Sequence, residues 1–238
     1  MSARLLSTQQ CTELDEAGYT VIEGVLSDAE CDLWSETIDS IWLGERGKIH
    51  QYAEEPGVQF VDNLLRFSPL FQKAAVEPVV LEAARRVLGP EIILNLMNAR
   101  RSDSGSGLQP LHDLDRRRGR PFLTCNTIWC LDEFNKANGA TRALPGSHLT
   151  GEPFLSRMID PLEPHPDEIR ITAPRGAVVI FNAHLLHAGG QNETDRPRRS
   201  VQSQFALPTQ QPFYDWKELP THIVDTISPE ARKLLVLN

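Results

Sequence analysis

The sequence has no apolar run that approaches the roughly 20 residues needed for a membrane-spanning helix. Its N-terminus, MSARLLSTQQCTELDEAGY, also lacks an apolar core of the length found in signal peptides. Neither a membrane anchor nor a secretory leader is therefore indicated. On these grounds we expect a soluble, cytoplasmic protein.

The sequence also has few cysteines and no excess of positive charge. None of its four cysteines forms a CxxC pair, so the thiols are expected to be buried or incidental. Lys and Arg number 24 against 32 Asp and Glu, which gives a formal charge of −8. This balance favours neither nucleic acid nor anionic membranes as partners. We expect a small-molecule substrate, and the sequence makes no prediction of the oligomeric state.

The first 90 residues show mainly helical patterns. No repeat, low-complexity tract or linker divides the chain, which predicts a single domain over residues 1–238. Ser27 and Glu30 have the spacing of a capping box, which marks the start of a helix. The expected elements are a helix over 8–17, a strand over 19–26, a helix from 27 to about 42 and a helix over 77–88.

After residue 90 the pattern changes to short strands separated by turn signals. Many short strands with turns between them predict a sandwich or barrel, and helices followed by strands predict the α+β class. We expect the proline-rich tail, residues 208–238, to pack on the outside. The expected strands cover 92–98, 122–131, 176–181 and 200–207, with a polar loop over 102–107.

Two of the seven histidines lie in settings that suit a metal site. His112 is followed by Asp113 and Asp115, and His187 follows a buried strand. Two imidazoles and a carboxylate can form a facial triad, which leaves three positions open on an octahedral Fe(II). Surface or structural histidines are the simpler explanation of such a pattern taken alone.

A basic residue near the second histidine adds to this pattern. Arg198 comes eleven residues after His187, where the last strand begins. An arginine close to a metal can pair in bidentate geometry with the far carboxylate of an acidic co-substrate such as 2-oxoglutarate. The competing interpretation is a solvated basic turn made of Arg196, Arg198 and Arg199.

Several segments, in order, resemble the phytanoyl-CoA dioxygenase family. The segment HAGGQNETDRPR, residues 187–198, resembles the distal half of the family motif, and QPLH, residues 109–112, resembles its proximal part. The middle segment is represented by WCLDEF, NGAT and LPGSH between residues 129 and 148. The opening GYTVIEGVLSDAE, residues 18–30, is similar to the family's N-terminal strand and helix, so the resemblance spans most of residues 8–207.

The resemblance implies a double-stranded β-helix (jelly-roll) core over about residues 91–207, with flanking N-terminal helices. It implies Fe(II), 2-oxoglutarate and O₂ as cofactor and co-substrates, with His187 rather than His184 as the distal iron ligand and Arg198 as the partner of 2-oxoglutarate. It implies a structural or exposed role for His148. The expected reaction oxidises, most often hydroxylates, an unactivated C–H and releases succinate and CO₂; desaturation, epimerisation and cyclisation remain open.

The carboxylate ligand departs from the family pattern, which is His-x-Asp. Leu114 occupies that position, and the aspartates are Asp113 and Asp115. A turn after His112 would bring Asp115 back beside the imidazole, which makes it slightly favoured, whereas a one-residue deletion would make Asp113 the equivalent. A halogenase-like site, a pseudoenzyme and a non-catalytic jelly-roll binding protein are the alternatives; a cupin-type cluster is not found.

The pocket and the substrate are less well specified. Thr127 and Trp129 share one face of a strand, and together with Asn98 they are candidates for lining the 2-oxoglutarate pocket, although core packing is an equal alternative for Trp129. The arginines around the proximal motif predict either an anionic substrate or solvated loop charges; they are Arg100, Arg101, Arg116, Arg117, Arg118 and Arg120.

Overall fold

The computed structural model describes residues 5–44, 55–113, 122–150 and 160–237. At the N-terminus, the predicted helix is present as α1 (Thr8–Thr12) and the π-helical η1 (Glu13–Ala17). Ser7 and Gln10 close a capping box at its start, and Gly18 ends it with φ of 85°. The chain then enters β1 (Tyr19–Ile22), which ends four residues earlier than expected.

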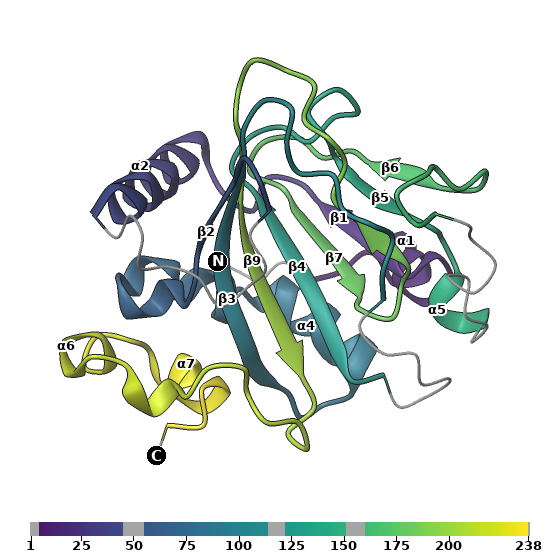
Figure 1. The fold of residues 1–238 in the computed structure, drawn as a ribbon. Helices are drawn as coiled ribbons and strands as arrows, with labels where there is room; N and C mark the ends of the chain where they lie inside the picture. Colours follow the sequence, from purple (N-terminus) through teal and green to yellow (C-terminus); the bar gives the residue numbers. More distant parts are fainter. Residues whose placement is uncertain (1–4, 45–54, 114–121, 151–159, 238) are drawn as a thin grey trace.

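The larger sheet has six antiparallel strands in the order β1-β7-β4-β9-β3-β2 (Figure 1). Its central strands carry almost continuous buried residues, as expected for strands covered on both faces. The bounds of the remaining strands are β2 (Val58–Val61), β3 (Ile93–Ser102), β4 (Thr124–Cys130), β7 (Val178–Asn182) and β9 (Arg198–Ala206).

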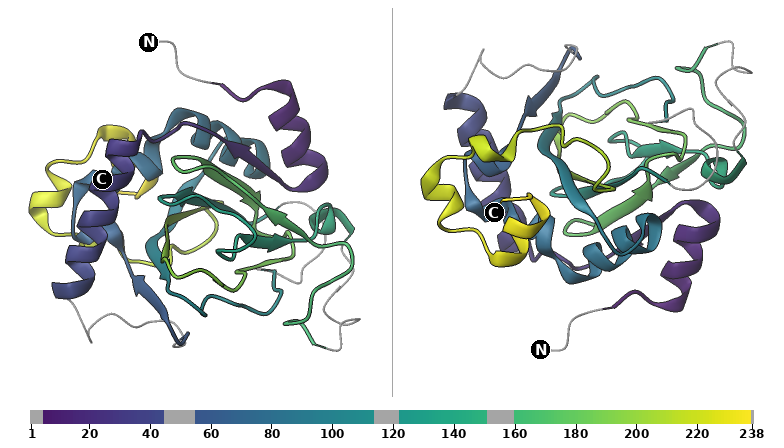
Figure 2. Two further views of the ribbon diagram at one scale, coloured as in Figure 1. Left: turned by 90° about the horizontal axis from the view of Figure 1, so that it is seen from above. Right: turned by 90° about the horizontal axis from the view of Figure 1, so that it is seen from below.

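The smaller sheet has the order β6-β5-β8. Its strands are β5 (Thr141–Ala143), β6 (Ile169–Ile171) and β8 (His187–Ala188). A further bridge pairs His112 with His187 at its edge. Viewed end-on in Figure 2, the strands surround an interior and the helices lie outside it.

Helices cover the outer face of the larger sheet. They include α2 (Asp28–Gly44), α3 (Lys73–Val76) and α4 (Pro78–Leu88), of which α2 and α4 match predicted helices. The main core lies between these helices and the sheet, and a second apolar cluster lines the inside of the strands. Among the described residues, no helix is both long and apolar enough to cross a membrane.

The tail packs on the outside of the larger sheet, as expected, and does so through buried residues (Figure 1). It contains η5 (Trp216–Glu218), α6 (Thr221–Val224) and α7 (Pro229–Leu234). Trp216 is only 2% exposed and donates its indole N–H to the carbonyl of Leu94 at 2.9 Å. Because its apolar residues join the main core, the tail is a structural part of the domain.

The strand predicted over 92–98 ended too early, whereas the polar loop expected over 102–107 follows β3 from residue 103. β3 continues to Ser102, paired with β9 from Ala99/Val201 to Ser102/Arg198. Cross-strand pairing therefore overrides the low strand propensity of the Asn-Ala-Arg-Arg sequence. This extension matters for the site, because it places Arg100 and Arg198 on neighbouring strands.

Candidate active site

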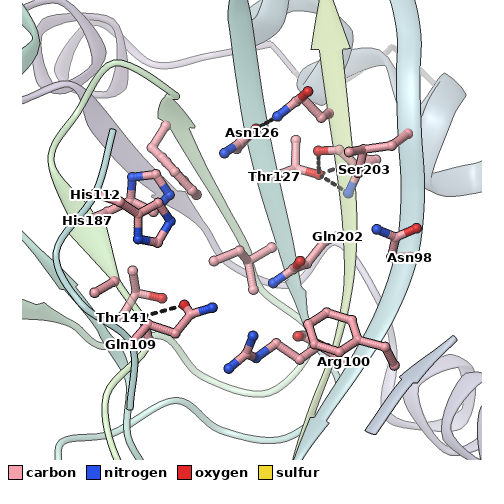
Figure 3. A pocket seen from close by; sticks show the side chains of 18 of the residues that line it. Asn98, Arg100, Gln109, His112, Asn126, Thr127, Thr141, His187, Gln202 and Ser203 are labelled. Atoms are coloured by element: carbon pink, nitrogen blue, oxygen red, sulfur yellow. Dashed lines mark hydrogen bonds between the residues drawn. The ribbon is translucent and has the colours of Figure 1, made fainter. Parts of the chain in front are cut away.

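A cavity of about 480 Å³ lies between the two sheets (Figure 3). Its walls come from β3, β4 and β9 of the larger sheet and from β5 and β8 of the smaller one. Both candidate histidines and Arg198 line it. Residues that are far apart in the sequence therefore meet in one pocket of the size that small-molecule sites usually have.

His112 and His187 form one pair within this cavity. Each residue's backbone N–H donates to the other's carbonyl at 2.9 Å, and the ring centroids are 4.5 Å apart. The Nδ1 atom of His112 is 2.8 Å from the carbonyl of Pro110, and that of His187 is 2.7 Å from the carbonyl of Leu185. These carbonyls hold a proton on each Nδ1, which leaves both Nε2 atoms with a lone pair for a metal.

Burial reinforces this protonation state at His187. Desolvation and, after it, the neighbouring His112 together lower the pKa of His187 to about 3, against the raising effect of its hydrogen bond to Leu185. The imidazole is therefore neutral near pH 7, as a metal ligand must be. Phe181 packs against its ring with 4.6 Å between centroids and fixes the plane of the imidazole.

The described residues do not supply a third ligand. They contain no group of three His, Cys, Asp or Glu side chains that could hold a metal ion, and Asp113 is among them. Asp115 and Leu114 lie outside the described residues. The two imidazole nitrogens are suitable donors for two positions of a metal centre.

Arg198 is the buried cation of the cavity. It is 5% exposed, donates to the carbonyl of Asn138 at 3.0 Å and to Ser102 Oγ at 3.3 Å, and lies over the ring of Phe134. No carboxylate of the described residues forms a salt bridge with it. Desolvation first, and then the nearby Arg100, lower the pKa of Arg198 to about 10, which still leaves it charged at pH 7.

The neighbouring arginines have other partners. Arg199 binds Asp132 and Asp39, so it is committed to the outer side of the sheet, and Arg196 is exposed. The interpretation of the whole segment as a solvated basic turn therefore fails for Arg198. A buried guanidinium that lines the cavity and has no carboxylate partner among the described residues is chemically suited to a carboxylate ligand.

Of the three predicted pocket residues, Asn98 and Thr127 line the cavity and Trp129 does not. The Thr127 hydroxyl bonds to Ser203 and receives the indole N–H of Trp129 at 3.2 Å. Trp129 is fully buried and packs against Trp34, 5.7 Å away, in the core under the helices. Its assignment to the cofactor pocket is wrong, because its ring lies on the helix-covered face of β4, the face to which the Thr127 hydroxyl also turns.

The two other histidines in the matching segments have structural positions. His184 accepts the backbone N–H of Leu123 at Nε2, at 3.1 Å, and lies outside the cavity lining. His148 is buried against Gly18, where a Cβ would come within 2.5 Å of its ring. Both therefore act in packing, as expected.

Sequence reasoning missed an ion pair and a set of amides in the cavity. Arg100 binds Glu55 through two hydrogen bonds of 3.0 and 2.7 Å, and Gln109 also donates to Glu55 at 2.9 Å. Gln202 and Gln204 stand at alternate positions of β9, a signal that was present in the sequence. With Asn95 and Asn126 they join the predicted Asn98 in the cavity lining.

Comparisons with known proteins agree with this geometry. The family model of phytanoyl-CoA dioxygenase (PhyH) matches residues 14–200. Dioxygenase af480 of Aspergillus fumigatus is 29% identical over 238 residues, covering 94% of this chain and 75% of that protein.

Two solved structures share the fold. HygX from Streptomyces hygroscopicus, with nickel and 2-oxoglutarate bound, is 18% identical with a TM-score of 0.72, covering 92% of this chain and 94% of that one. The epimerase SnoN, in complex with Fe3+, alpha-ketoglutarate and nogalamycin RO, is 17% identical with a TM-score of 0.67, covering 84% of this chain and 83% of that one. The predicted α+β jelly-roll fold is confirmed.

Proposed function

Because the chain belongs to the phytanoyl-CoA dioxygenase (PhyH) family, we propose that it binds Fe(II) through His112 and His187, pairs Arg198 with 2-oxoglutarate, and hydroxylates an unactivated C–H of a small molecule. Family membership confirms the broader prediction, a 2-oxoglutarate-dependent non-haem iron dioxygenase that uses O₂. The residue roles and the hydroxylation are the new parts of the proposal.

One observation carries the proposal: two imidazoles with their Nε2 atoms available share a cavity with a buried arginine that has no carboxylate partner in the described residues. The histidines offer neutral nitrogen donors, and Arg198 offers a fixed pair of N–H donors. A co-substrate with a chelating end and a carboxylate end suits both groups at once.

The histidines, Arg198 and the cavity have different roles in this reaction. When bound, iron and 2-oxoglutarate supply the oxidising power for C–H oxidation, with succinate and CO₂ as by-products. The two carbonyls on the Nδ1 atoms keep the imidazoles oriented, and Arg198 orients the co-substrate by its far carboxylate. The apolar side chains of Phe181 and Phe134 line the cavity beside His187 and Arg198 and shield these two groups from water.

A small molecule is the substrate that the cavity suits. A volume of about 480 Å³ must hold the co-substrate and the substrate together, which leaves no room for a folded macromolecule. HygX has also been crystallised with hygromycin B, and SnoN with nogalamycin RO, so this fold admits small-molecule substrates of natural-product type.

The test combines metal binding with turnover. Addition of Fe(II) and 2-oxoglutarate without oxygen should produce the weak visible charge-transfer band, and admission of air should produce succinate. His187→Ala should abolish both signals. His184→Ala is the matched control, because this imidazole lies three residues earlier and outside the cavity lining, and it should keep metal affinity within a few fold. Loss of the band in His184→Ala but not in His187→Ala would contradict the ligand assignment.

A further inference from the structure

The cavity wall opposite the two histidines is polar but carries no net charge. Figure 3 shows Gln202 and Asn126 on this wall, away from His112 and His187. We propose, resting on the function proposed above, that the oxidised substrate is an uncharged molecule with hydroxyl or carbonyl oxygens on a hydrocarbon ring frame. Gln202 and Asn126 bind these oxygens.

Among the described residues, the charges that line the cavity are matched once the co-substrate is bound. Apart from the histidines, the described lining residues with ionisable side chains are Glu55, Arg100 and Arg198. Glu55 and Arg100 neutralise each other through two hydrogen bonds, and the Arg100 side chain is 6% exposed. Arg198 is left for the carboxylate of the co-substrate. Among the described residues, a charged substrate would therefore find no free counter-charge, and burying an unpaired charge is costly.

The other arginine next to this strand is also committed. Arg101 binds Asp39 at 3.2 Å and Asp103 at 2.8 Å. Of the arginines that could have received an anionic substrate, Arg100 and Arg101 are thus neutralised by carboxylates, and those over 116–120 lie outside the described residues.

The carboxamides have free hydrogen-bonding capacity on the cavity side. The register pairs Gln202 with Ile128 and with Asn98, and Asn126 with Gln204, so these side chains share the inner face of the sheet. Gln204 donates to Asn126 Oδ1 at 2.7 Å, which points the amide hydrogens of Asn126 away from that bond. Within the described residues, the Gln202 side chain makes no hydrogen bond. Together, the carboxamides of Asn126 and Gln202 offer N–H donors to carbonyl or hydroxyl oxygens, and the Gln202 carbonyl can accept from a hydroxyl.

Apolar side chains in the same cavity indicate that most of the substrate is hydrocarbon. Leu96 and Ile128 line the cavity together with the carboxamides, and Phe60, Phe181 and Phe213 add aromatic rings to its lining. A purely apolar acyl chain would match these groups but would leave the carboxamides without water or partners. A ring system with a few oxygens satisfies both kinds of surface.

The experiment uses four probes of similar size: cyclohexanediol, hydroxycyclohexanecarboxylate, aminocyclohexanol and methylcyclohexane. Dissociation constants are measured by ligand-observed NMR on the full chain loaded with Zn(II) and 2-oxoglutarate. Binding of 2-oxoglutarate to the Zn(II) protein is measured first, and its absence contradicts the proposed function rather than the substrate class. We expect the diol to bind at least about tenfold more tightly than the other three.

Two variants of Gln202 test the residue assignment. Gln202→Met keeps the length of the side chain and should weaken the diol at least about fivefold. Gln202→Glu places an unpaired carboxylate in the wall and should reverse the order, so that aminocyclohexanol binds best. Gln9→Met, at an exposed glutamine of α1, is the matched control and should change nothing. Equal or tighter binding of a charged or apolar probe to the wild type, or an unchanged order in Gln202→Glu, would overturn the proposal.

Discussion

His112 and His187 are paired through their backbones by two hydrogen bonds of 2.9 Å, and their imidazole rings are also in contact, with 4.5 Å between centroids. The backbone pairing fixes the distance between the Cα atoms, and the carbonyls of Pro110 and Leu185 fix the rings. The geometry of the two donors is therefore part of the fold and does not depend on a bound ion to create it.

The low pKa of His187 predicts how the metal-free protein responds to acid. Its pKa falls from 6.5 in the unfolded chain to about 3 in the fold, so the unfolded state binds more protons between these values and stability is lost as pH falls from 6.5 towards 3. The full effect is on the order of 5 kcal/mol, of which about 2 kcal/mol is present near pH 5.

Urea unfolding of chelator-treated protein near pH 7 and pH 5 measures this loss. His187→Gln should lose less stability than the wild type over the same interval, because glutamine takes up no proton. His222→Gln, at an exposed histidine, is the control and should behave like the wild type. Equal acid sensitivity of wild type and His187→Gln would show that other groups cause it.

Arg198 should reduce stability in the absence of co-substrate. Burial lowers its pKa from 12.5 to about 10, which corresponds to a cost on the order of 3 kcal/mol, partly offset by its bonds to Asn138 and Ser102. We expect Arg198→Met to be at least as stable as the wild type without ligand. It should bind 2-oxoglutarate at least about tenfold more weakly, since a buried charge pair typically loses roughly 2–5 kcal/mol when truncated.

Thermal melts with and without 2-oxoglutarate separate the two effects. The ligand should raise the melting temperature of the wild type and of Arg196→Met, the exposed control, but not that of Arg198→Met. Undiminished stabilisation of Arg198→Met would assign the carboxylate to another cation.

Trp129 should matter for stability and not for the co-substrate. Trp129→Phe removes part of its packing against Trp34 and its bond to Thr127, for a cost of roughly 1–3 kcal/mol. Its affinity for 2-oxoglutarate should stay within about twofold of the wild type, measured by titration calorimetry. A large loss of 2-oxoglutarate affinity at unchanged stability would show that Trp129 belongs to the co-substrate pocket after all.

The sequence predicted the fold more fully than the site. Periodicity and capping located α2, α4 and the central strands, because each signal is local. The jelly-roll was predicted from the family resemblance. The match of the family model to residues 14–200 then supported that prediction. The pairing of Arg100 with Glu55 depends on residues 45 positions apart, and no local pattern could indicate it. The face taken by Trp129 depends on strand register, which helix packing decides.

Arg142 should act as a positioning residue for the metal site. It is 1% exposed, binds Glu168 with two nitrogens, and donates to the carbonyls of Leu162 and Glu163. Its neighbour Ala143 pairs with His187. Removing one partner of a buried pair costs roughly 3–5 kcal/mol, so Arg142→Met should be strongly destabilised.

The double variant Arg142→Met with Glu168→Leu should recover much of that stability, because it leaves no buried charge alone. Its Zn(II) affinity should still be reduced several-fold, since the polar ties between β5 and the 162–163 segment are gone. Wild-type metal affinity in the stable double variant would limit Arg142 to a structural role.

The third ligand remains the sharpest prediction of the site. We propose that a carboxylate from residues 113–115 completes it, with Asp115 slightly favoured over Asp113. Two neutral imidazoles leave the double charge of Fe(II) without compensation, and a nearby carboxylate offsets part of it while one face stays open. Asp113 directly follows a residue fixed in a backbone bridge, and the described residues do not group it with the imidazoles.

Local geometry decides which carboxylate can reach. In an extended segment, side chains at i and i+1 point to opposite faces, so an Asp113 in regular strand geometry would point away from His112. A turn after His112 would bring Asp115 back. Asp113→Asn and Asp115→Asn should therefore differ: one should lose nearly all Fe(II) binding and succinate formation, while the other stays close to wild type. If both variants kept full activity, the carboxylate ligand would be wrong, and dependence of the product on chloride would be the next measurement, because a halide can then take the open position.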